Sequence, residues 1–132
     1  MALKSAALKI GVLISGRGSN LQALLDASTG DSPYRIVHVV SNVATAAGLE
    51  IARRHEVAAS VIDHRGFADR VAFDAAMDQA LRAAGVEFVC LAGFMRLLSD
   101  GFVEAWRDRM LNIHPSLLPA FKGRHPQRQA LE

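Results

Sequence analysis

Short apolar segments alternate with amphipathic segments along this 132-residue chain. Strands covered on both faces are expected to be apolar runs, and such runs occupy residues 8–14, 34–40, 58–62, 86–91 and 110–114. Helical spacing between them is clearest at residues 69–84, where Phe73, Met77 and Leu81 repeat every four residues. Alternating strands and helices build parallel, right-handed βαβ units. We therefore predict a single-domain, Rossmann-like α/β fold, an open parallel sheet with helices on both faces.

The composition argues against several classes of protein. The net charge is +2 and the basic residues form no run, so nucleic-acid binding is not expected. No apolar run reaches membrane-spanning length, and the residues before Ile14 do not resemble a signal peptide. The one cysteine, Cys90, lies in an apolar run, which indicates a buried thiol in a reducing, cytoplasmic setting. The five histidines show no metal-ligand spacing, so no metal is expected.

The loop after the first strand is rich in glycine and polar residues. Residues 15–20 read Ser-Gly-Arg-Gly-Ser-Asn, and such glycines let backbone N–H groups approach an anion at a helix N-terminus. Ser19 and Asn20 add side-chain donors and Arg17 can add positive charge, so we predict that this loop binds a phosphate. Ser19 and Gln22 form a capping-box pattern, which predicts Ser19 as the helix N-cap. Leu21 replaces the third glycine of a dinucleotide-binding motif, which favours a single phosphate. The alternative is a tight turn with a capped helix.

Asn112 and His114 lie two residues apart in the last strand, so their side chains share one face. Pro115 favours an extended His114 at the strand end, where open α/β sheets bind ligands. An amide can donate to an oxyanion that forms at a carbonyl, and an imidazole can shuttle a proton. The pair suits formyl or acyl transfer to an amine without a covalent intermediate. A polar pair that only satisfies loop backbone is an equally good explanation.

The loop after the fourth strand is a third candidate region. Gly93 is followed by residues that could line a slot for a flat heterocycle. Core packing of Leu97 and Leu98, with Arg96 in an ion pair elsewhere, explains the same pattern equally well. Arg70 lies at the start of the third helix, and the sequence pattern alone favours a solvent-exposed residue without a role in binding.

Residues 14–22, 91–98 and 111–119 together resemble the phosphoribosylglycinamide formyltransferases, a folate-dependent family of purine biosynthesis. The resemblance implies an enzyme that moves a formyl group from 10-formyltetrahydrofolate to the amine of glycinamide ribonucleotide. It also implies a role for each matching residue: the substrate phosphate would be held by Gly18, Ser19 and Asn20, the folate by Arg70, Met95, Arg96, Leu97, Leu98 and Asn112, and catalysis would belong to Asn112 and His114.

The family's catalytic aspartate lies beyond the last residue of this sequence, so the resemblance implies a formyltransferase fold whose C-terminal part is missing. We expect residues 1–106 to form a phosphate-binding βαβ part, residues 107–132 to begin the catalytic part, and these 132 residues alone to be nearly inactive. A last strand without a neighbour would leave an open edge, and a homodimer formed there is a hypothesis. The alternatives are a methionyl-tRNA formyltransferase, a formyltetrahydrofolate hydrolase or a non-catalytic nucleotide-binding module.

Overall fold

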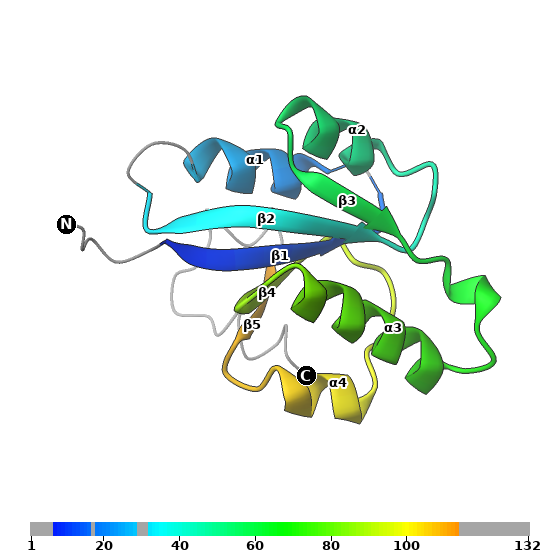
Figure 1. The fold of residues 1–132 in the computed structure, drawn as a ribbon. Helices are drawn as coiled ribbons and strands as arrows, with labels where there is room; N and C mark the ends of the chain where they lie inside the picture. The colour runs from blue at the N-terminus through cyan, green and yellow to red at the C-terminus, as the bar shows by residue number, and fades with distance from the viewer. Residues whose placement is uncertain (1–6, 17, 29–31, 114–132) are drawn as a thin grey trace, which may run out of the picture.

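The computed structural model describes residues 7–16, 18–28 and 32–113 and contains a five-stranded sheet (Figure 1). All four strand pairings are parallel, and the order across the sheet is β3-β2-β1-β4-β5. This confirms the predicted Rossmann-like sheet. The strands are β1 (Leu8–Ile14), β2 (Tyr34–Ser41), β3 (Ala58–Val61), β4 (Phe88–Ala92) and β5 (Met110–Ile113).

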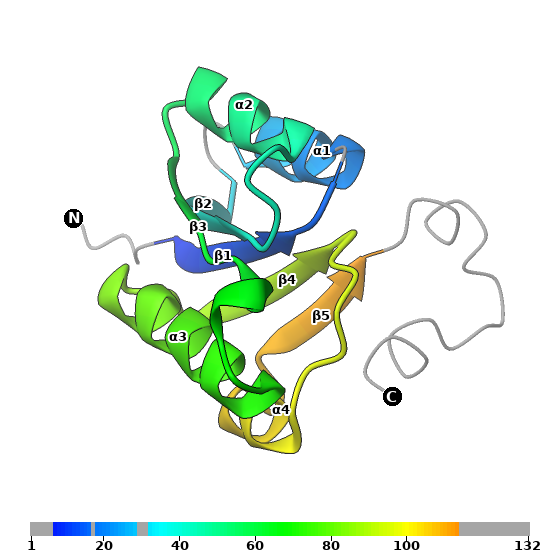
Figure 2. The ribbon, with the colours of Figure 1, turned by 90° about the vertical axis from the view of Figure 1, so that its right-hand side faces the viewer.

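Helices cover both faces of the sheet (Figure 2). One face carries α1 (Ser19–Ala27) and α2 (Ala47–Arg54), and the other carries α3 (Arg70–Ala83) and α4 (Asp100–Ala105). A short 3-10 turn, η1 (His64–Gly66), precedes α3. No helix within the described ranges is long and apolar enough to span a membrane.

Strand β1 lies at the centre of the sheet and contributes to both apolar cores. Val12 and Ile14 pack in the cluster beneath α1 and α2, whereas Leu13 packs in the cluster beneath α3 and α4. This alternation follows from the two-residue period of a strand. All three side chains are fully buried, as expected for a central parallel strand with both faces covered.

The predicted apolar face of α3 is confirmed, because Phe73, Met77 and Leu81 are at most 1% exposed. Asp69 caps this helix by accepting a hydrogen bond from the Ala72 backbone N–H. Helix α4 is capped in the same way by a side chain at its N-terminus. Ser99 accepts from the Phe102 backbone N–H at the start of α4, and both Phe102 and Trp106 are buried.

The predicted N-cap of α1 is wrong. Ser19 is already the first helical residue, and the N-cap is Gly18, with φ 87° and no side-chain capping bond. The physical reason is that the left-handed backbone of Gly18 turns the chain into the helix one residue earlier, and glycine is the residue that adopts this conformation without strain. Strand β4 also begins at Phe88, two residues later than predicted.

The strand order places a topological switch between β1 and β4. The chain moves outward from β1 through β2 to β3 and then returns to β4 on the opposite side of β1. Loops leaving the carboxyl ends of β1 and β4 therefore diverge towards opposite faces of the sheet, and such a crevice is the usual ligand site of open α/β folds. The loops predicted to bind phosphate and heterocycle flank this crevice.

Candidate active site

The glycine loop after β1 packs directly against the start of α2. The Gly48 N–H donates to the Gly16 carbonyl at 3.1 Å. A Cβ placed on Gly18 would lie 2.7 Å from the Gly48 Cα, which is closer than a methyl group can approach a carbon atom. The loop conformation therefore requires glycine at position 18, where the chain also has a positive φ. Sequence reasoning missed Gly48, since its role appears only when α2 is placed beside the loop.

The N-terminus of α1 differs from those of α3 and α4 in its capping. It has neither a side-chain cap nor an acidic residue in its first turn, whereas α3 and α4 are capped by Asp69 and Ser99. The first N–H groups of a helix lack intrahelical partners and carry the positive end of the helix dipole. This arrangement is the one that phosphate groups prefer.

The side chain of Asn20 joins the start of α1 to the end of β5. Asn20 is 8% exposed, and its Nδ2 donates to the Ile113 carbonyl at 3.0 Å. The loop predicted to bind phosphate therefore adjoins the end of the strand that carries Asn112. The side chains of Ser19 and His114 lie outside what the structure describes, so their predicted roles are not tested here.

A cavity of about 630 Å³ opens beside the ends of β4 and β5. Its volume lies in the range of roughly 300–1,000 Å³ that is usual for small-molecule sites. Four of the predicted folate-binding positions of the loop line it, together with Asn112 from the strand. The described residues that line the cavity are Leu91, Phe94, Met95, Arg96, Leu97, Leu98, Asp100, Val103, Glu104, Met110 and Asn112. Met95 and Leu97 are 79% and 72% exposed, so these apolar side chains are available to a ligand.

Asn112 faces this cavity as strand alternation predicts. Met110, two residues earlier, also lines the cavity, whereas Ile113 packs in the core on the opposite face of the sheet. Asn112 pairs with Leu91 in the register of β4 and β5. The amide therefore lies between the ends of two parallel strands, where its N–H groups can reach a ligand in the cavity.

Buried polar side chains connect the loops that follow four strands. The Ser15 hydroxyl donates to Asn42 Oδ1 at 2.5 Å and accepts from the Met95 backbone N–H at 2.9 Å. Asn42 Nδ2 lies 3.2 Å from His64 Nδ1. The sequence analysis did not assign roles to Ser15 and Asn42. The available signal was that Ser15 and Asn42 are polar residues at the ends of apolar strands, at the edge where ligands bind.

Arg70 is exposed at the start of α3 and is not among the residues that line the 630 Å³ cavity. Its predicted contact with folate stays a prediction. Cys90 is buried, as expected, and burial raises the pKa of its thiol to about 11. A thiol in this state is a poor nucleophile at neutral pH.

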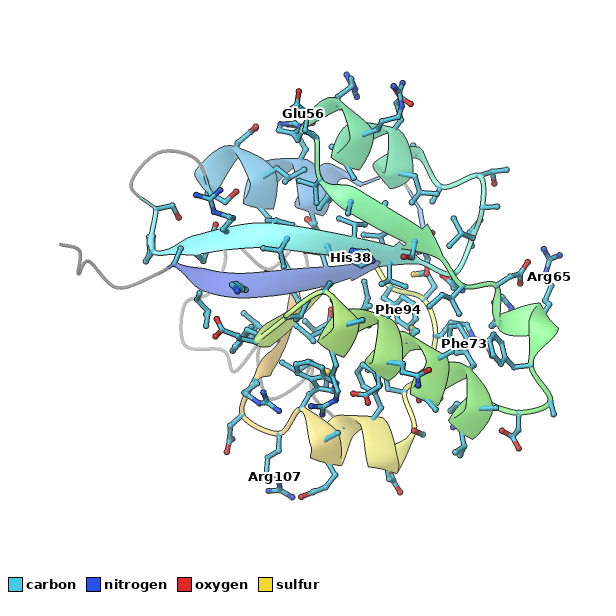
Figure 3. The ribbon with its side chains drawn as sticks, viewed as in Figure 1. His38, Glu56, Arg65, Phe73, Phe94 and Arg107 are labelled. Atoms are coloured by element: carbon cyan, nitrogen blue, oxygen red, sulfur yellow. The ribbon has the colours of Figure 1, made fainter. Side chains whose placement is uncertain are left out.

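Two exposed arginines are paired with carboxylates. Arg65 and Arg107 point outward from different parts of the molecule (Figure 3). Arg65 pairs with Asp63 at 2.7 Å, and Arg107 pairs with Glu104 at 2.8 Å. The Arg65 partner holds the pKa of Asp63 well below its usual range. In the described ranges no group of three His, Cys, Asp or Glu side chains has a geometry that could hold a metal ion.

Comparison with known proteins finds one family along nearly the whole chain. The profile of the formyl transferase family matches residues 8–132. The trifunctional purine biosynthetic protein adenosine-3 of Homo sapiens is 51% identical over 125 residues, which are 94% of this chain and 12% of that protein. The phosphoribosylglycinamide formyltransferase of Escherichia coli is 46% identical over 126 residues, which are 95% of this chain and 59% of that protein.

Solved structures show the same fold. The glycinamide ribonucleotide transformylase 1 of Symbiobacterium toebii superposes with a TM-score of 0.79 at 53% identity, over 95% of this chain and 59% of that one. The phosphoribosylglycinamide formyltransferase of Brucella melitensis gives a TM-score of 0.81 at 41% identity, over 96% and 66%. The chain therefore spans about three fifths of the length of its single-function relatives.

Proposed function

The chain belongs to the formyl transferase family, and on this premise we propose that it takes part in moving a formyl group from 10-formyltetrahydrofolate to the amine of glycinamide ribonucleotide. The reaction would belong to purine biosynthesis in the cytoplasm. The observation that carries the proposal is that the glycine loop at the uncapped start of α1 is joined, through the hydrogen bond from Asn20 to the Ile113 carbonyl, to the strand whose Asn112 lines the 630 Å³ cavity.

The ribonucleotide phosphate would bind at the N-terminus of α1. The backbone of Gly18, Ser19 and Asn20 forms the start of this helix, and the absence of acidic side chains from the first turn avoids repulsion of a phosphate. Gly48 supports this loop from behind by its bond to the Gly16 carbonyl. A dinucleotide is disfavoured, because Leu21 occupies the third glycine position of that motif.

The folate would bind against the β4–α4 loop. The exposed side chains of Met95 and Leu97 offer an apolar surface for a flat ring, and the loop backbone offers hydrogen bonds to its polar edges. Arg96 and Leu98 complete this wall of the cavity. Arg70 would have to act on a part of the folate that extends beyond the cavity, since it is not among the lining residues.

In the proposed reaction, the amine nitrogen forms a bond to the formyl carbon, and the bond between this carbon and N10 of the folate breaks. The amine loses a proton and N10 gains one. Asn112 would donate an N–H to the formyl oxygen as negative charge develops there. His114 would accept and pass on the proton, because an imidazole titrates near neutral pH.

Formylation of glycinamide ribonucleotide by the intact protein tests this proposal. We expect turnover, followed as release of tetrahydrofolate, and we expect Asn112→Ala to lower kcat by about 10²–10³-fold, as measured for other oxyanion donors. Leu111→Val is the matched control, because Leu111 is adjacent on β5 but does not line the cavity. No turnover by the intact protein, or equal rates in the two variants, would contradict the assignment.

The phosphate site has its own test. Glycinamide riboside lacks only the phosphate of the ribonucleotide, so the proposal predicts much weaker binding of the riboside by calorimetry. Equal affinity for the two compounds would show that the loop after β1 does not hold the phosphate. A protein that binds folate but does not bind the ribonucleotide at all would favour one of the other formyl enzymes of the family.

A further inference from the structure

The loop between β4 and α4 is held at both ends by side chains that come from elsewhere in the chain. At its start, the Met95 N–H donates to the Ser15 hydroxyl at 2.9 Å, across 80 residues of sequence. At its end, the Ser99 N–H donates to Asp74 Oδ2, across 25 residues. One anchor follows β1 and the other lies on α3, so the loop is fixed to two separate elements of the fold.

Both anchoring side chains are buried and oriented. Ser15 is 9% exposed, and its only hydroxyl proton is donated to Asn42, which is 4% exposed. A lone pair of the Ser15 oxygen is thereby left facing the Met95 N–H. Because Asn42 also contacts His64 at 3.2 Å, the orientation of this hydroxyl is fixed by a connected set of polar side chains.

Asp74 is an unusual residue for its position. It is 2% exposed and follows Phe73 on the buried side of α3. Its Oδ1 has no hydrogen-bond partner within the part of the chain that the structure describes. A buried carboxylate with an unsatisfied oxygen destabilises a fold, and such groups require an explanation beyond stability. The hydrogen bond from the Ser99 N–H to Asp74 offers such an explanation, because this bond sets where the loop ends and α4 begins.

Between the two anchors the loop presents its ligand-facing side chains. Phe94 and Leu98 pack into the core cluster that includes Phe73 (Figure 3 labels Phe94 and Phe73). Met95 and Leu97 remain 79% and 72% exposed along the cavity. A loop with fixed ends and exposed apolar side chains is preorganised, and preorganisation lowers the entropic cost of binding.

We propose that Ser15 and Asp74 are positioning residues that set the affinity for reduced folate by clamping the β4–α4 loop, although neither needs to touch the ligand. This inference rests on the proposed function, because it names residues that support the folate site. Ser15 also begins the loop that would bind phosphate, so one hydroxyl links the two proposed substrate sites.

Calorimetry of the intact protein with 5-formyltetrahydrofolate, a stable reduced folate, tests the clamp. Ser15→Ala and Asp74→Ala are each expected to weaken folate binding about tenfold, the effect of losing one hydrogen bond to a buried acceptor. In turnover assays the KM for folate should rise about equally in the two variants. In Asp74→Ala, whose side chain lies on α3 and not in the glycine loop, kcat and the KM for the ribonucleotide should stay within twofold. Asp74→Asn keeps an acceptor oxygen for Ser99 and should restore folate binding.

Asp78→Ala is the matched control. Asp78 lies one turn further along α3 and accepts from Trp106 Nε1 at 2.9 Å, so its loss weakens the packing of α3 and α4 without releasing the loop. Equal loss of folate affinity in this variant would overturn the clamp, because general destabilisation would then explain the result.

Hydrogen exchange separates failure of the clamp from failure of the proposed function. The Met95 amide should exchange faster in Ser15→Ala, and the Ser99 amide should exchange faster in Asp74→Ala. Faster exchange with unchanged folate affinity would overturn the inference and leave the proposed function standing. An intact protein that binds neither ribonucleotide nor folate would overturn the proposed function and, with it, this inference.

Discussion

Replacing Gly18 by alanine should distort the glycine loop more than any other glycine change at this edge of the sheet. Two separate costs meet at this position. Gly18 has φ 87°, and a left-handed backbone costs a residue with a Cβ about 1–2 kcal/mol. The new methyl group would also lie 2.7 Å from the Gly48 Cα and 3.2 Å from the Gly48 nitrogen. Forcing an extra methyl group into a packed site costs about 1–3 kcal/mol.

The two costs together lower the free energy of unfolding by about 2–5 kcal/mol, a large part of the roughly 5–15 kcal/mol that is typical of a folded protein. The contact is with backbone atoms of α2, so rotation of a side chain cannot relieve it. At a urea m-value of about 1.5 kcal/mol/M, a loss of about 3 kcal/mol lowers the unfolding midpoint by about 2 M. Phosphate binding should be lost as well, because the loop must move away from α2.

Two further glycine variants separate the causes in urea unfolding experiments. A Cβ on Gly16 would meet no atom within 4 Å at an ordinary φ, so Gly16→Ala should change the stability by less than about 0.5 kcal/mol or raise it slightly. Gly93 has φ 77° with no atom within 4 Å, so Gly93→Ala should show only the backbone cost of about 1–2 kcal/mol. If Gly18→Ala is no less stable than Gly93→Ala, the reasoning about the contact with Gly48 is refuted.

Three other predictions concern the cores and the sheet. In urea unfolding, Phe73→Ala should lower the free energy of unfolding by about 3–5 kcal/mol, because Phe73 is 1% exposed. Val71 is 66% exposed on the same helix, so Val71→Ala should change this free energy by less than about 0.5 kcal/mol. Burial lowers the pKa of His38 in the folded protein. As the pH falls through the pKa of about 6.5 that a histidine has in an unfolded chain, the unfolded state therefore binds more protons than the folded state, and the free energy of unfolding should decrease. The same decrease, measured by urea unfolding at several pH values, should be smaller in His38→Gln. Alkylation of the Cys90 thiol should occur at the rate of unfolding in the native protein, and fast labelling without urea would contradict its burial.

The sequence by itself determined the layout of the fold. The period of the apolar residues identifies α3 and its buried face, and the apolar runs locate the five strands, because burial on one or two faces leaves a direct trace in the residue pattern. Alternation along β5 also predicted that Asn112 faces away from the core residue Ile113. The sequence did not determine the start of α1, because a left-handed turn at Gly18 begins this helix in place of the side-chain cap expected from Ser19.

Only the tertiary structure decided which residues support the site. The contact between Gly18 and Gly48, and the hydrogen bonds of Ser15 and Asp74 to the β4–α4 loop, join segments that lie 25 to 80 residues apart. Such contacts depend on strand order and helix placement, which place the ends of β1 and β4 side by side. A single sequence records the local period of each segment but not which loops meet in space, so these supporting residues become visible only in the folded chain.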